Sequence, residues 1–155
     1  PAAMENKVFN FFRFEDLRIY HKALEYSRWV NAQVKEISSG VLTDQFVRSF
    51  SKAATNIAMH IAEGSGRNKS QFVYYLKMAK SCVRESVVYT TIGLNEGYLN
   101  EEQHEESRSL LIEISKMVGA LITSLQKGRT KDETDESDEH NVDDAPLTSD
   151  EEFDL

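Results

Sequence analysis

The sequence predicts an all-α protein, an antiparallel up-down-up-down four-helix bundle followed by a disordered acidic C-terminal tail. Apolar residues recur at steps of three and four in four segments of about 20 residues, and short polar or glycine-containing breaks separate these segments. Seven Gly and two Pro among 155 residues are few for an all-β fold, which uses both residues in its many turns. With 40% hydrophobic and 28% charged residues, the chain suits one globular domain.

The first helix is expected over residues 14–37, where the apolar positions form one continuous stripe. A break at 38–40 separates it from the second helix, for which Thr43 or Asp44 is the expected N-cap. The second helix is expected to end at 64–66, where small residues allow a neighbouring helix to approach closely.

The third helix is expected to begin near Ser70 and to fray between Gly93 and Gly97. Asn100, with Gln103 three residues later, is the expected cap of the fourth helix, which should end at 127–128 with a cation followed by a glycine. The second and third helices carry apolar residues on more than one face. This pattern fits either self-association or a thick single core.

The charge divides the chain into two parts. Residues 1–128 contain 16 basic and 14 acidic residues, whereas residues 129–155 contain 2 and 12. We therefore expect a bundle over 12–128 and a disordered tail over 129–155, preceded by a flexible segment, 1–11, whose first three residues are typical of a cloning remnant. The tail fits a solubilising segment, a docking peptide with apolar anchors at Phe153 and Leu155, or an internal competitor for a basic surface.

Several classes of function are disfavoured by the sequence. It contains no nucleotide-binding, hydrolase or zinc-protease motif, so we expect no catalytic residue and no cofactor. Cys82 is the only cysteine, which excludes an internal disulfide and fits a cytoplasmic protein, and we expect it to pack as a small apolar residue. One Glu-x-x-His pair at 101–104 is too little for a dimetal centre, and no metal site is expected. No apolar run of about 20 residues and no signal peptide is present, so no membrane partner is expected.

The candidate binding residues are basic. Lys77, Lys80 and Arg84 are spaced three and four apart on the third helix, and with Arg67 and Lys69 they are expected to form a basic strip that binds nucleic acid. The turn at 64–70 adds backbone amides that can hold a phosphate. The alternative is a solvated helix face beside an ordinary interhelical connection.

Two carboxylates, Glu63 and Glu85, are expected in apolar surroundings. A buried carboxylate needs a partner, so we expect a structural ion pair or a hydrogen bond at a helix end instead of a catalytic role. The candidate partners are Arg48, Arg67 and Arg84.

The chain also resembles a known family. The resemblance rests on residues 12–24, 53–55 and 61–67, on Phe72, Leu76, Ala79, Ser81 and Glu85 in the third helix, and on 97–99 and 114–117. These segments are similar to four-helix-bundle proteins encoded in intervening sequences of bacterial 23S rRNA genes, over about residues 12–127. His60 departs from the pattern because the family usually has Asn at this position, and residues 46–49 resemble one added helical turn.

The resemblance implies a homopentamer without established enzymatic activity. A relative in diversity-generating retroelements, the accessory variability protein, binds its reverse transcriptase and nucleic acid. We therefore expect a non-enzymatic, homo-oligomeric adaptor that associates with RNA, DNA or a nucleic-acid enzyme such as a reverse transcriptase, modulated by its acidic tail. The alternative is a scaffold whose tail docks a partner protein.

Overall fold

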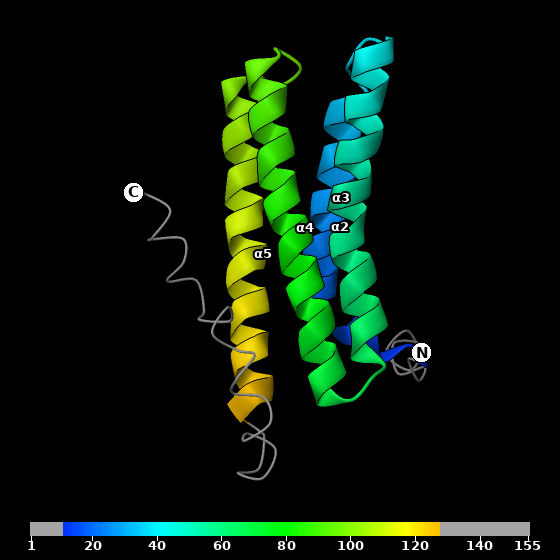
Figure 1. Ribbon diagram of the computed structural model, residues 1–155, viewed down its shortest axis with the longest axis vertical. Coiled ribbons are helices and arrows are strands. Elements are labelled where there is room, and N and C mark those ends of the chain that lie inside the picture. The colour runs from blue at the N-terminus through cyan, green and yellow to red at the C-terminus, as the bar shows by residue number, and fades with distance from the viewer. Residues whose placement is uncertain (1–10, 128–155) are drawn as a thin grey trace, which may run out of the picture.

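The computed structural model describes residues 11–127, and the expected acidic tail at 129–155 lies outside these described residues. Four long helices run alternately up and down, which confirms the predicted all-α bundle (Figure 1). They are α2 (Arg18–Val34), α3 (Val41–Ser65), α4 (Lys69–Asn95) and α5 (Glu101–Lys127), and a short 3-10 helix, η1 (Arg13–Asp16), precedes them. Each helix packs on the next one along the chain, and α5 returns to α2.

The first long helix begins later than the apolar pattern predicts. Leu17 has extended backbone angles of φ −76° and ψ 124°, which separate η1 from α2. The Phe14 ring lies edge-on against Tyr20 at 5.0 Å, and the His21 ring donates a hydrogen bond to the backbone oxygen of Glu15. These contacts stabilise the corner, so the residues before Leu17 fold back against the start of α2.

The α3 helix begins earlier than expected. Gly40 is its N-cap, so Thr43 and Asp44 lie in the first turn. The Thr43 hydroxyl donates to the Ser38 carbonyl oxygen at 2.9 Å, and Asp44 accepts a hydrogen bond from the Ser39 hydroxyl at 3.1 Å. Both side chains therefore stabilise the connection before α3 instead of capping its first residue.

Side chains also fix the helix ends of the second half of the bundle. Asn68 accepts a hydrogen bond from the Gln71 N–H at 2.9 Å and caps α4. The predicted cap of α5 is confirmed, because Asn100 and Gln103 bond reciprocally at 2.7 and 2.8 Å. Gln103 also donates to Gln33 on α2 at 2.8 Å, so one residue both caps α5 and joins it to another helix.

Gly97 ends α4 instead of merely fraying it. Its φ of +77° is the left-handed conformation that glycine adopts without strain. The following residue, Tyr98, donates its N–H to the Gly93 carbonyl oxygen at 2.8 Å, and Gly97 donates to that of Leu94 at 3.2 Å. These two bonds form a Schellman motif.

The core is apolar along its length and contains one buried hydroxyl pair. The largest apolar side chains with at most 1% exposure are Phe50, Ile57, Ile61, Leu76, Leu111 and Ile114. Among them, the Tyr26 hydroxyl on α2 and the Ser107 hydroxyl on α5 lie 2.7 Å apart. Burial raises the pKa of Tyr26, so its phenol stays protonated and each hydroxyl satisfies the other.

By length and composition, α5 is apolar enough to cross a membrane. It is the one such helix within residues 11–127, and core helices of soluble bundles pass the same test. In the bundle α5 buries Leu111, Ile114, Val118 and Ile122 against the other helices. Core packing therefore accounts for these four apolar residues of α5.

Candidate nucleic-acid interface

The basic strip predicted on the third helix lies on α4. Lys69 and Arg84 are exposed, whereas Lys77 and Lys80 are half-buried along their stems. At about 100° per residue, Lys77, Lys80 and Arg84 lie roughly 140–200° around α4 from Tyr75. Because the Tyr75 side chain packs against Gly64 of α3, the strip lies on the side of α4 away from α3. These cations share one stripe of the helix, as the spacing predicts.

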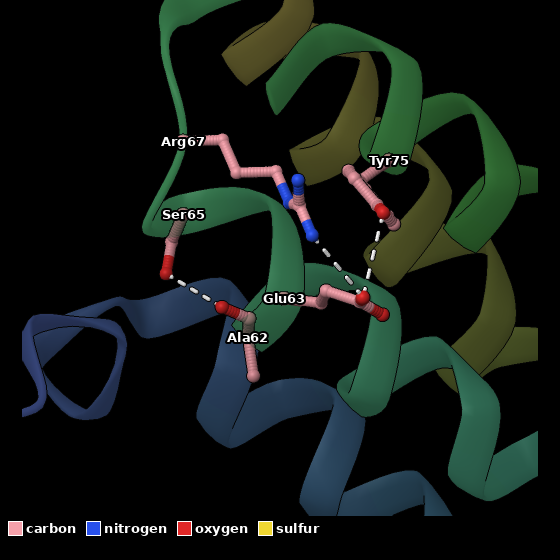
Figure 2. Close-up of polar contacts among 5 residues, drawn as sticks. All are labelled: Ala62, Glu63, Ser65, Arg67 and Tyr75. Carbon is pink, nitrogen blue, oxygen red and sulfur yellow. Dashed lines mark hydrogen bonds and ion pairs between the residues drawn. The ribbon is translucent and has the colours of Figure 1, made fainter. Parts of the chain in front are cut away.

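The structure separates Arg67 from this strip. The Arg67 guanidinium turns toward α3, where its Nη2 lies 3.5 Å from Glu63 Oε1 and its Cζ lies 4.9 Å from the centroid of the Tyr75 ring (Figure 2). The Tyr75 hydroxyl donates to the same Glu63 oxygen at 3.4 Å. Arg67 thus forms a small cluster at the α3–α4 turn that joins the two helices.

The expected burial of the two carboxylates is wrong. The Glu63 side chain is 53% exposed and Glu85 is also exposed, because both lie on outward-facing sides of their helices. Glu63 does form one of the anticipated ion pairs, with Arg67. Arg48 is exposed on α3 about four turns from Glu63, too far along the helix to be its partner.

His60 lies next to this cluster. Its ring centroid is 6.4 Å from that of Tyr75, and its Nδ1 is buried without a hydrogen-bond partner among the described residues. The resemblance places an Asn at this position in most family members. His60 therefore fills part of the space between α3 and α4 while leaving one polar atom unsatisfied.

Two segments without carboxylates become neighbours when α4 and α5 are considered together. No Asp or Glu occurs between Arg67 and Arg84, or between Ile114 and Lys127. Because α4 and α5 are antiparallel neighbours, the first half of α4 lies beside the second half of α5 (Figure 1). We call these two adjacent segments the basic face; their cations are Lys69, Lys77, Lys80 and Arg84 on α4 and Lys116 and Lys127 on α5.

The α5 contribution to the basic face was missed in the sequence analysis. Lys116 and Lys127 are exposed, but they belong to a different segment from the strip, and only the antiparallel pairing brings the segments together. The signal available in the sequence was the absence of carboxylates from both segments. The nearest acid on α5 is Glu113, three residues before Lys116, and its carboxylate lies 3.2 Å from Lys22 of α2.

Cys82 is buried at the inner side of α4, as expected. Burial and the nearby charge of Glu85 raise the pKa of its thiol from 9.0 to about 11. The thiol of the unfolded chain ionises first, so we expect the free energy of unfolding to decrease as the pH rises from 9 toward 11. Urea titrations at pH 8, 9 and 10 measure this slope, and Cys82→Ala should make it shallower. An equal slope in both proteins would contradict the burial effect.

Other chemistry is not apparent in the described part of the chain. Within residues 11–127, no group of three or more His, Cys, Asp or Glu side chains is placed to hold a metal ion. His104, from the Glu-x-x-His pair, lies 3.9 Å from Glu105 and beside no second such pair. The basic face is therefore the surface whose chemistry most directly indicates a ligand, namely an anion.

The fold and this surface define the class: a small antiparallel four-helix bundle with a carboxylate-free basic face along one helix pair. A sequence profile for the 23S rRNA-intervening sequence protein family matches residues 15–120. The chain belongs to this family, and the match covers α2, α3 and α4 completely and α5 as far as residue 120. A search of curated proteins found no match.

Proposed function

We propose that this protein is a non-enzymatic, homo-oligomeric adaptor that associates with nucleic acid or with a nucleic-acid enzyme such as a reverse transcriptase. The observation that carries the proposal is the basic face, which presents six cations over two helix segments without a carboxylate in either. Cations arranged along about 22 Å of helix match the spacing of several successive phosphates. Such contacts position a nucleic acid without reading its sequence.

Self-association is part of this proposal, and apolar side chains on the outer surface support it. Met59 on α3 is 59% exposed, and Tyr74, Val88 and Ile92 on α4 are 58%, 56% and 39% exposed. Side chains of this size are usually covered when they form a continuous surface. In a pentamer, the form that family resemblance implies, five copies of the basic face would act together on one ligand.

Charge reversal tests the proposed site. We expect the triple variant Lys77→Glu, Lys80→Glu, Arg84→Glu to bind labelled single-stranded RNA or duplex DNA at least tenfold more weakly at 50 mM salt. The dependence of log K on log salt should become shallower by about one for each lost phosphate contact. Fluorescence anisotropy measures both quantities, while circular dichroism and light scattering show whether helicity and mass are unchanged.

A matched control makes the same change in net charge at three cations outside the basic face. The triple variant Arg28→Glu, Lys35→Glu, Lys52→Glu changes the total charge equally at three exposed cations, on α2, at its C-cap and on α3. This control should retain most of the affinity. Equal losses in the two triple variants would show that net charge alone governs binding, and the assignment of the basic face would be rejected.

A further inference from the structure

We propose that the basic face also binds the acidic segment 132–155 of the same chain. This inference rests on the proposed function because it assigns a second, competing ligand to the same surface. The segment contains 12 acidic and no basic residues, so it is the strongest concentration of negative charge in the sequence. The basic face is its complement within the described fold, since its two helix segments contain no carboxylate.

The topology of the bundle places the start of this segment near one end of the basic face. The α5 helix ends at Lys127, at the same end of the bundle where α4 begins at Lys69 (Figure 1). Both residues belong to the basic face. The first acid of the segment, Asp132, follows Lys127 by five residues, which span at most about 18 Å of chain. Reaching Arg84 along α4 requires about 22 Å more, which the 24 residues of the segment exceed.

Electrostatics favours a surface where cations outnumber carboxylates. The two segments of the basic face contain six Lys or Arg residues and no Asp or Glu. Attraction between exposed charges extends about 10 Å at 0.1 M salt, which favours places where several cations lie together. Attachment to the same chain gives the segment a millimolar effective concentration at the basic face.

The consequence is competition between the segment and an external polyanion. An RNA must displace the negatively charged segment 132–155 before it can bind. The full chain should therefore bind RNA more weakly than a chain without this negative charge. Competition of this kind depends on charge, so high salt weakens both contacts. An external polyanion therefore binds only if its affinity for the basic face is high enough to displace the segment.

Cross-linking of the intact chain tests the contact without any nucleic acid. A carbodiimide joins a carboxylate directly to a lysine amine when the two are in contact. We expect cross-links from the acids of 132–155 to Lys77 and Lys80 at 50 mM salt, and their loss at 1 M salt. The matched controls are two exposed lysines, Lys35 at the C-cap of α2 and Lys52 on α3. Absent links, or links equally frequent at the two control lysines, would overturn the proposal.

Isotope labelling distinguishes a contact within one chain from a contact between copies. Labelled and unlabelled protein are mixed, and the mass of each cross-linked peptide pair shows whether its halves come from the same chain. Same-chain pairs support the proposal. Exclusively mixed pairs would overturn it and place the segment on a second copy.

Two further full-length variants measure the consequence for binding. In the first, every Asp and Glu of 132–155 is replaced by Asn or Gln; in the second, the residues of the segment are shuffled at constant charge. We expect the neutral variant to bind labelled single-stranded RNA at least tenfold more tightly than the native chain at 50 mM salt, and the shuffled variant to behave like the native chain. A shuffled variant that loses its cross-links would contradict a contact based on charge.

The two proposals fail in different ways. Cross-links to Lys77 and Lys80 without RNA binding by the neutral variant would reject the proposed function and leave the internal contact standing. Equal RNA binding by native and neutral chains, with no cross-links, would reject the internal contact and leave the proposed function standing.

Discussion

Replacing Phe50 with Ala is expected to lower the free energy of unfolding by about 3–5 kcal/mol. Phe50 is fully buried on α3, and its ring lies 5.6 Å from that of Phe46 and 6.1 Å from that of Tyr89 on α4. Removing the ring leaves a cavity where the two helices meet, and relaxation of the surrounding side chains fills it only in part. Domains of this size are typically stable by about 5–15 kcal/mol, so the loss is a large fraction of the total.

Urea unfolding followed by circular dichroism at one fixed protein concentration measures this change. Lys52→Ala is the matched control, since Lys52 lies on the same helix but is exposed and lies outside the apolar surface proposed for self-association. We expect the control to change stability by no more than about 0.5 kcal/mol. If Phe50→Ala were equally mild, the α3–α4 core could not be packed as described.

Gly64→Ala is expected to destabilise the protein by about 2 kcal/mol, although Ala is normally the better helix former. An added Cβ at this position would lie 2.5 Å from the Tyr75 Cβ and 3.0 Å from the Phe72 Cδ1. The first of these atoms is fixed to the α4 backbone, so α3 and α4 must move apart. The movement would also disturb the contacts of Tyr75 with Glu63 and Arg67.

Gly66→Ala is the matched control for this substitution. Gly66 lies two residues further along, has a φ of −84° that any residue adopts, and has no atom within 4 Å of an added Cβ. We expect its stability to stay within about 0.5 kcal/mol of the native value in the same urea titration. Similar losses at both glycines would indicate a backbone effect instead of a steric one.

The sequence was sufficient to predict most of the fold. The number, order and approximate bounds of the helices follow from apolar spacing, and the Asn100–Gln103 cap follows from local chemistry. The start of α2 was mispredicted because the apolar stripe continues through the corner at Leu17, where tertiary contacts of Phe14 decide the backbone path. The spacing of apolar residues indicates which face of a helix is apolar, but it does not show whether a turn interrupts the helix.

The candidate site was predictable only in part. The strip on α4 could be found because its residues share one helix, whereas Lys116 and Lys127 join it through the pairing of α4 with α5. The burial of Glu63 and Glu85 was mispredicted because apolar neighbours in sequence need not be neighbours in space. Arg67 was grouped with the strip for the same reason, although its side chain turns to Glu63 and Tyr75.

The hydroxyl pair between Tyr26 and Ser107 constrains how this protein can change over generations. Replacing Tyr26 alone removes the partner of the buried Ser107 hydroxyl, whereas replacing both by apolar residues of similar shape can be nearly neutral. Replacing Ser107 alone is milder, because Ser86 also interacts with the Tyr26 hydroxyl. We therefore expect loss of Tyr26 to be followed by loss of the Ser107 hydroxyl, 81 residues away in the chain, more often than the reverse.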